Sequence, residues 1–340
     1  MLTPSEELEL SSPTLRGATV SIDYHNAQTI LRTEQRNPNV VFEVYAGTDG
    51  LLSGVNEVLP FLRARLPVSN SQVFSLSDGE TISEGETILR IIGPYAAFGM
   101  YRDVITGIFA SSIGWATAAN ECVQAAGNTR VIVSGSPYIH PDVVDSMEYS
   151  AYIGGCAAVS TQKGGDRTAT VPQGSMPHDF VLIWGAADRA MTVYDRHSRL
   201  GAQRVMPIPT TGDAIQEALD AAYALSGGTT NPLRAVKVNV PENLGGGTPA
   251  LATELKARLS DAGFGSVDVY VAGELTPELI AEYEASDAEV GLYIVGRYVA
   301  AAHPVPVVAA IKEIDGKAVA PRGMAPGRVH NHRMLQRELN

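Results

Sequence analysis

Hydrophobic and polar positions divide the chain into two regions with different patterns. In the first third, short β-branched runs alternate with turn residues. Residues 40–45 alternate as a half-buried strand does, and the dipeptides Asp78-Gly79 and Glu84-Gly85 interrupt β-branched runs, which is a hairpin signal. A helix is expected within residues 19–32. A longer helical region is expected from Pro94 to Gly127, where apolar residues recur at helical spacing.

From residue 129 onward, short β-branched runs alternate with helical stretches. Strands are expected at residues 130–133, 157–161, 205–208, 235–240, 267–271 and 290–295, and helices at 212–226, 250–262 and 276–286. This repetition predicts parallel strands joined by crossover helices. Six or more units in about 170 residues favour a barrel, although an open sheet also fits. A hairpin around Asp315-Gly316 is expected to return to the first region.

Composition narrows the class of protein. The 340 residues are 45% hydrophobic and 18% charged, which suits a soluble globular protein of one large or two smaller domains. A formal net charge of -12 argues against nucleic acid and anionic membranes as partners. Residues 1–16 lack the apolar core of a signal peptide, and Cys122 and Cys156 fit buried thiols in a reducing compartment. A cytoplasmic protein is therefore predicted.

Metal and nucleotide motifs are not found in the sequence. The seven histidines show no metal-ligand spacing, and two cysteines are too few for a thiolate site, so no metal site is predicted. The pair His330-Asn-His332 fits a solvated tail. The cluster from Gly245 to Thr248 lacks the Lys-Ser/Thr ending of a phosphate-binding P-loop, and it fits a flexible loop after a strand.

Five segments carry the strongest functional signal. They are Val133-Ser-Gly-Ser-Pro-Tyr-Ile-His-Pro141, Ala151-Tyr-Ile-Gly-Gly-Cys156, Gly174-Ser-Met-Pro-His178, Ala272-Gly-Glu-Leu275 and the tail from Ile314 to Gly323. In this order, the set resembles the nicotinate phosphoribosyltransferases, enzymes that join a pyridine acid to ribose 5-phosphate. Each segment alone is a weak signal, whereas the ordered set is a strong one.

The resemblance implies a type II phosphoribosyltransferase fold. That is an irregular, TIM-like α/β barrel, expected at residues 116–304. A smaller mixed α/β hammerhead or sandwich domain is expected at 1–115 and completed by 305–340. It also implies a homodimer or higher homo-oligomer with active sites near the interface. The implied partners are a small-molecule phosphoribosyl substrate and an aromatic acceptor. No tightly bound cofactor is implied, whereas Mg²⁺ with phosphoribosyl pyrophosphate, and the use of ATP, fit the family.

The resemblance assigns roles to individual positions. His178 stands where relatives carry a histidine that ATP can phosphorylate, and the simpler interpretation is a histidine hydrogen-bonded under a loop. The other implied substrate-binding residues are Ser136, Tyr138 and His140 near the base, Lys237 and Asn239 near ribose and pyrophosphate, and Tyr24 near the family's aromatic segment. Gly273 and Gly291 are the implied phosphate-binding glycines, because a bare backbone lets N–H groups approach a phosphate. Tyr138 also fits a packed loop residue.

Several positions depart from the family pattern. Ser134 stands for a stacking phenylalanine, Pro137 and Tyr138 stand for arginines, and Asn239 stands for an aspartate. Glu274 and Glu289 place a carboxylate in each of the two segments assigned to phosphate binding. A carboxylate in contact with a phosphate would cost at least about 1 kcal/mol.

These departures leave three hypotheses. The first is a nicotinate phosphoribosyltransferase-like enzyme, with nicotinate as the default acceptor or with an altered one. The second is a catalytically degenerate homologue that binds a ligand or a partner subunit. The third is hydrolysis of the C–N bond of an N-ribosyl phosphate, with Asp23 or Glu274 as general base. The first is the prediction.

Overall fold

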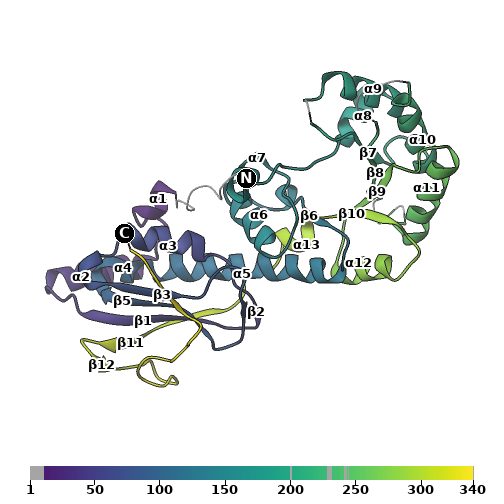
Figure 1. The fold of residues 1–340 in the computed structure, drawn as a ribbon. Coiled ribbons are helices and arrows are strands. Elements are labelled where there is room, and N and C mark those ends of the chain that lie inside the picture. The colour runs from purple at the N-terminus through teal and green to yellow at the C-terminus, as the bar shows by residue number, and fades with distance from the viewer. Residues whose placement is uncertain (1–10, 200, 228–231, 241–242, 244, 340) are drawn as a thin grey trace. The chain divides into compact units, whose positions relative to one another are not determined.

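The structure, a computed structural model, separates into two compact units (Figure 1). It describes residues 11–199, 201–227, 232–240, 243 and 245–339, so much of the stretch assessed for a signal peptide lies outside it. The first unit is Met1–Thr117 with Ala302–Asn340, and the second is Ala118–Ala301. The domain boundaries predicted at 115/116 and 304/305 stay a prediction. No helix among the described residues is long and apolar enough to cross a membrane.

The first unit is built on a six-stranded antiparallel sheet. Its strands are β1 (Asn39–Ala46), β3 (Gln72–Ser75), β5 (Thr87–Pro94), β11 (Val307–Ile314), β12 (Lys317–Ala318) and β13 (Leu335–Arg337), in the order β12-β11-β1-β5-β3-β13, and β2 (Gly50–Leu51) pairs with β4 (Thr81–Ile82). Its helical segments are α1 (Ser12–Leu15), α2 (Ile22–Thr33), α3 (Val55–Arg63), η1 (Val68–Asn70), α4 (Tyr95–Phe98), η2 (Gly99–Tyr101) and the start of α5 (Arg102–Ala125).

The predicted turns lie in this unit, with one difference in pairing. Asp315-Gly316 joins β11 to β12, and β11 pairs with β1, which confirms the return to the first region. Asp78-Gly79 and Glu84-Gly85 are turns at the ends of β4, but β3 pairs with β5 and β4 pairs with β2. Asp78 instead accepts hydrogen bonds from Val55 N (2.8 Å) and Asn56 N (3.1 Å) at the start of α3. The turn residue therefore caps a helix.

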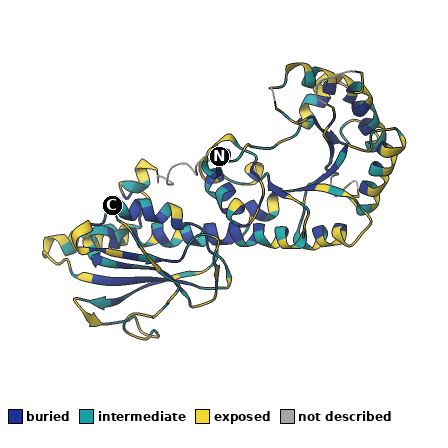
Figure 2. Ribbon diagram, in the orientation of Figure 1, coloured by how far each residue is buried: buried dark blue, intermediate teal, exposed yellow. Residues whose placement is uncertain are grey.

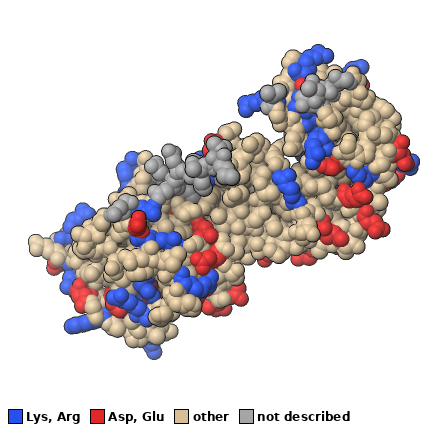
Figure 3. All heavy atoms as spheres, viewed as in Figure 1, with Lys and Arg blue, Asp and Glu red and all other residues tan. Residues whose placement is uncertain are grey.

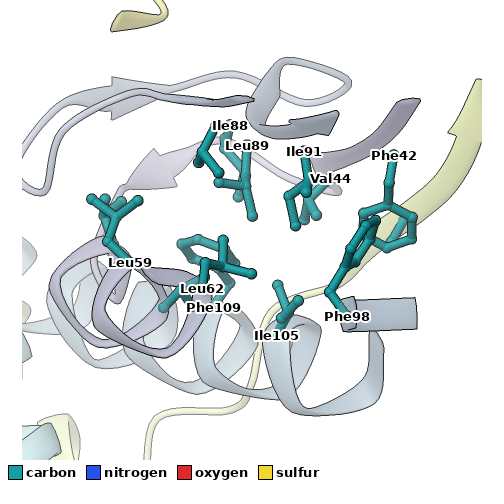
Figure 4. Packing of buried hydrophobic residues seen from close by; sticks show 14 of the residues in the cluster. Phe42, Val44, Leu59, Leu62, Ile88, Leu89, Ile91, Phe98, Ile105 and Phe109 are labelled. Carbon is teal, nitrogen blue, oxygen red and sulfur yellow. The ribbon is translucent and has the colours of Figure 1, made fainter. Parts of the chain in front are cut away.

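One face of this sheet packs on helices. Phe42 and Val44 of β1 alternate toward the same side, where they meet Ile105 and Phe109 of α5 together with Leu62 of α3 (Figure 4). All five side chains are buried. Burying each one stabilises the fold by roughly 1.5–3 kcal/mol.

The residues that alternate with them face the opposite side and form a polar network. Glu43 of β1 is fully buried, and it accepts hydrogen bonds from Arg90 Nε (2.6 Å), from the Tyr45 hydroxyl and from Val329 N (3.3 Å). Burial and the Glu43 carboxylate raise the pKa of Tyr45. The network attaches the C-terminal segment to the sheet.

The second unit is built on parallel strands. These are β6 (Val131–Val133), β7 (Val205–Ile208), β8 (Ala235–Val238), β9 (Asp268–Ala272) and β10 (Val290–Val295), in the order β6-β10-β9-β8-β7. The helical segments around them are η3 (Ser136–Tyr138), η4 (Pro141–Val143), α6 (Val144–Ile153), α7 (Gln162–Thr168), α8 (His178–Trp184), α9 (Ala187–His197), α10 (Ala214–Ala224), α11 (Pro249–Asp261), α12 (Pro277–Glu284) and α13 (Arg297–Ala300). Buried residues follow the strands, whereas exposed residues lie on the outer helices (Figure 2).

Two extended segments close these five strands into a ring. Residues 157–159 form no strand, contrary to the prediction, but Ala157 N donates to Val131 O of β6 (2.7 Å). Gln173 N then donates to Val159 O (2.9 Å), and Met176 N donates to Val205 O of β7 (3.1 Å). The barrel interior is a buried cluster with one residue from each strand and one from the first segment: Ile132, Ala158, Val205, Ala235, Tyr270 and Leu292. The mixed α/β fold class with a barrel-like unit is confirmed.

Candidate functional site

The carboxyl ends of the parallel strands meet at one end of the barrel. We call this end the barrel mouth and define it by residues 134–138, 178, 210–212, 237–239, 273–274 and 296–297. Loops after parallel strands carry the active sites of α/β barrels, because they are free to vary while the strands hold them in place.

Lys237 and Asn239 lie on the inner side of β8 at the mouth. Ala235 belongs to the barrel core, and side chains two residues apart on a strand point to the same side. Both side chains are half-buried. No hydrogen bond or ion pair of Lys237 occurs among the described residues, and burial lowers the pKa of its ammonium group. A Cβ on Gly273 would lie 3.1 Å from Asn239 Oδ1, and Gly273 has φ +116°, so this loop needs glycine.

His178 is the first residue of α8 and is held by Thr210 across the mouth. Its Nδ1 lies 2.9 Å from Thr210 Oγ1, which donates its own proton to Pro207 O (3.0 Å). Thr210 can therefore only accept from His178, so Nδ1 carries the proton of the neutral ring and Nε2 keeps its lone pair. Burial lowers the pKa of His178, and the charge of Lys237 lowers it further, against Glu217 and Asp179.

The loop between β7 and α10 is closed by a carboxylate of the protein itself. Glu217 of α10 is 5% exposed, and it accepts from the backbone N–H groups of Thr210 (2.6 Å), Thr211 (2.5 Å) and Gly212 (2.9 Å). The Thr211 hydroxyl adds a fourth hydrogen bond (2.7 Å). These donors are therefore occupied.

A second buried glutamate organises the segment that follows residues 157–159. Glu148 of α6 is fully buried and accepts from Ser160 N (3.0 Å), Ser160 Oγ (2.7 Å) and Thr161 N (3.3 Å). A Cβ on Gly164 would lie 1.9 Å from its Oε2. This carboxylate thus holds the first turn of α7 close to α6.

The loop between β9 and α12 differs, because one of its first N–H groups is unused. The Gly273 N–H follows the paired residue Ala272 and points along the ladder to Ile294, whereas no hydrogen bond donated by the Glu274 backbone occurs among those of the described residues. The Glu274 carboxylate lies 3.4 Å from Arg297 Nη1. Burial raises the pKa of Tyr138, and the charge of Glu274 adds to this rise. Arg297 thus balances a carboxylate that the sequence left unopposed.

Gly296 brings Tyr138 into this cluster. A Cβ on Gly296 would lie 3.0 Å from Tyr138 Cε2 and 2.9 Å from Ser134 O. The bare backbone therefore lets the tyrosine ring approach the end of β10. Tyr138 itself is 43% exposed at the mouth.

Three predicted residues lie elsewhere. Gly291 is the second residue of β10, beside Asp268 at the start of β9, so it lies about 13 Å along the strand from the mouth. The imidazole of His140 is 72% exposed and accepts from Asp142 N (3.2 Å), which caps η4. Tyr24 lies on α2 and packs on the core of the first unit.

The placement of Gly291 has a physical reason. The resemblance places residues 289–292 at the family's second phosphate-binding loop. In the structure, Glu289 precedes β10 and residues 290–292 are the first three residues of that strand. Gly296, which follows the strand, occupies the position after β10 where a loop glycine is expected. The signal was available in the sequence, since Gly296-Arg297 follows directly on the β-branched run. Thr210 carried no comparable signal.

Charges of both signs are interspersed on the surface in Figure 3. Among the described residues, no group of three or more His, Cys, Asp or Glu side chains is arranged to hold a metal ion. The mouth instead combines the Lys237 ammonium group, the Asn239 amide, the His178 imidazole and the backbone N–H group of Glu274. Neither the Lys237 ammonium group nor the Glu274 N–H has a partner among the described residues. Such a set suits an anionic, hydroxyl-bearing ligand.

Comparisons with known proteins agree with this geometry. A profile of the quinolinate phosphoribosyl transferase N-terminal domain matches residues 28–112. The crystal structure of nicotinate-nucleotide pyrophosphorylase from Pyrococcus furiosus superposes with a TM-score of 0.85 at 28% identity, covering 94% of this chain and 81% of that one. In sequence and fold, the chain is therefore similar to type II phosphoribosyltransferases.

Two further comparisons agree. A nicotinate phosphoribosyltransferase of Mycobacterium tuberculosis is 28% identical over 107 residues, which are 32% of this chain and only 24% of that protein. Human nicotinic acid phosphoribosyltransferase superposes with a TM-score of 0.71 at 16% identity over 91% of this chain and 77% of that one, which shows a shared fold.

Proposed function

We propose that this phosphoribosyltransferase-like protein transfers ribose 5-phosphate between pyrophosphate and an aromatic, pyridine-like acceptor. Nicotinate is the default acceptor. The observation that carries the proposal is the convergence, at the barrel mouth, of Lys237, which has no partner among the described residues, with Asn239, the bare backbone of Gly273 and the free backbone N–H group of Glu274. These groups match the charge and hydroxyl pattern of a phosphoribosyl substrate.

The reaction needs electrostatic stabilisation at two places. Breaking the bond between C1 and pyrophosphate creates a cation-like sugar and a polyanionic leaving group. In the proposed arrangement, the Lys237 ammonium group binds pyrophosphate, the Asn239 amide binds a ribose hydroxyl, and the backbone at Gly273 receives the 5-phosphate. Mg²⁺ enters with the pyrophosphate of the substrate, whose oxygens are its preferred ligands.

The acceptor and the histidine complete the proposal. Tyr138 offers a half-exposed ring and a hydroxyl, and Ser136 lies beside it on η3. His178 has its Nδ1 fixed by Thr210, so Nε2 is the atom that contacts or accepts phosphate, including phosphate from ATP.

The geometry weakens the case for a degenerate homologue. That hypothesis rested on charge changes at four places, but Glu289 precedes β10 at the end opposite the mouth, and Glu274 is balanced by Arg297. The comparisons do not favour it, because the similar proteins are named as transferases and a pyrophosphorylase. We also propose that the protein is cytoplasmic and forms a homodimer or a larger homo-oligomer with its active sites near the subunit interface.

The test is a transfer assay with radiolabelled acceptor. The full chain is incubated with phosphoribosyl pyrophosphate and Mg²⁺, with and without ATP, and with nicotinate, nicotinamide or quinolinate. The proposal expects a labelled mononucleotide that is lost in Lys237→Met and kept in the matched control Lys163→Met. If no mononucleotide forms with any of the three acceptors, the assignment of a pyridine-like acceptor is wrong. Release of free base from a mononucleotide, without pyrophosphate, would favour the hydrolase.

A further inference from the structure

The five lysines of this chain differ sharply in how their amines are held. The structure describes all of them: 163, 237, 256, 312 and 317. Lys163 pairs with Asp145 at 3.0 Å, Lys256 donates to two backbone carbonyls at 2.9 and 3.2 Å, and Lys312 donates to a third carbonyl. Lys317 is exposed on β12. Only Lys237 is sheltered while having no hydrogen-bonding or ionic partner among the described residues.

The surroundings of Lys237 disfavour a permanent ammonium ion. Its strand neighbour on the inner side, Ala235, belongs to the apolar barrel core, and its partner in the register on β9 is Tyr270 of the same core. The charge of Lys237 lowers the pKa of His178, so protonation of one of these two groups disfavours protonation of the other. Removal from water without a counter-ion favours the neutral amine, and its pKa is lowered accordingly.

We propose that Lys237 Nζ is a nucleophile that forms an imine with aldehydes carrying a phosphate group, among them open-chain ribose 5-phosphate. The nitrogen lone pair attacks the carbonyl carbon, the C=O π bond breaks, and a proton moves from nitrogen to oxygen to give a carbinolamine. The C–O bond then breaks with loss of water, which carries away the carbonyl oxygen and both amine protons. The C=N bond that remains needs no oxidant or reductant.

The phosphate requirement comes from the loop beside Lys237. Asn239 follows Lys237 on the same side of β8 and lies against Gly273, and the N–H of the next residue, Glu274, is unoccupied among the described residues. Backbone N–H groups at such a loop bind phosphate oxygens. A small phosphorylated aldehyde can therefore be held by its phosphate while its carbonyl carbon meets the amine.

This activity goes beyond the proposed transfer reaction. Phosphoribosyl pyrophosphate has its C1 blocked by pyrophosphate, so it has no aldehyde and forms no imine. Ribose 5-phosphate, in contrast, opens to an aldehyde. The two reactions share the mouth but use different bonds, so one can fail while the other holds.

The test maps adducts on the wild-type chain. The protein is incubated with pyridoxal 5-phosphate and, separately, with ribose 5-phosphate, each trapped by cyanoborohydride, and the lysine peptides are quantified by mass spectrometry. The Lys237 amine has no partner among the described residues and lies beside a loop that can hold the phosphate of the aldehyde. We therefore expect Lys237 to be labelled several-fold faster than Lys317, and an equal or faster rate at Lys317 would overturn the nucleophile.

Separate arms test the sugar and the phosphate. Trapping by pyridoxal 5-phosphate alone, with no ribose 5-phosphate adduct, would overturn the inclusion of sugar aldehydes. Glyceraldehyde lacks a phosphate, so it should favour Lys237 over Lys317 less than ribose 5-phosphate does, and an equal preference for Lys237 with both aldehydes would remove the phosphate requirement. Inorganic phosphate should slow labelling of Lys237 and spare Lys317. The variants Lys237→Arg and Lys317→Arg then show which adduct disappears from the intact mass.

Discussion

Two loops at the barrel mouth have similar positions and opposite organisation. After β7, the backbone N–H groups of Thr210, Thr211 and Gly212 all donate to the buried carboxylate of Glu217. After β9, the N–H group of Glu274 donates to nothing among the described residues, and the Glu274 carboxylate pairs with the exposed Arg297. The donors of the first loop are all satisfied without a ligand, whereas the second loop keeps a free donor.

The difference shows that a glutamate near a phosphate-binding loop can have two distinct roles. A buried carboxylate that receives several N–H groups takes the place of an anionic ligand and becomes part of the scaffold. An exposed carboxylate paired with arginine leaves the donors free and tunes the local charge. Substitutions at the two glutamates and at their neighbours in the barrel test this distinction.

The largest effect is expected from removing the scaffold carboxylate. Glu217→Ala leaves four donors without their acceptor, three of them backbone N–H groups, which should lower the free energy of unfolding by about 3 kcal/mol. The matched variant Glu274→Ala should cost less than about 0.5 kcal/mol, because its pair is exposed. Denaturant unfolding of both variants measures the contrast, and equal losses would contradict it.

A smaller effect is expected from removing the unpaired charge. Lys237→Met should weaken binding of phosphoribosyl pyrophosphate about tenfold, since a hydrogen bond to a charged group contributes roughly 1.5–3 kcal/mol. Glu274→Ala should strengthen binding a few-fold by freeing Arg297. Calorimetric titration checks both signs, and unchanged affinity in Lys237→Met would exclude this side chain from the pyrophosphate site.

A third contrast compares two glycines of β10 and its loop. Gly296→Ala places a Cβ 3.0 Å from the Tyr138 ring and should displace it, raising KM for the acceptor several-fold. Gly291→Ala meets only Asp268 at the far end and should leave that KM unchanged. A KM that responds to Gly291 rather than to Gly296 would restore the original alignment.

The smallest effect is a shift in the titration of His178. Its pKa is below the ordinary value of about 6.5, so the unfolded chain binds protons more readily and stability falls as the pH drops below that value. Above it, the ring is neutral in both states and contributes nothing. Lys237→Met should raise the midpoint of the His178 titration followed by NMR, because it removes a charge that lowers this pKa, whereas Lys163→Met should leave the midpoint unmoved.

The sequence predicted the elements better than it predicted their contacts. Five of the six parallel strands and the Asp315-Gly316 hairpin followed from local periodicity and turn chemistry. Residues 157–159 and 173–176 close the barrel through isolated backbone hydrogen bonds, which leave no periodic pattern. The roles of Glu148 and Glu217 depend on loops brought back by the fold. Gly291 was misplaced because a motif alignment outweighed the strand that contains it.

The most direct measurement is a calorimetric titration of the wild-type chain with phosphoribosyl pyrophosphate and Mg²⁺. If the free N–H donor of Glu274 and the unpaired Lys237 form a phosphoribosyl site, binding will be micromolar and weaker in Lys237→Met. If the wild-type chain gives no heat at millimolar ligand, the barrel mouth does not bind phosphoribosyl groups and the central claim is wrong.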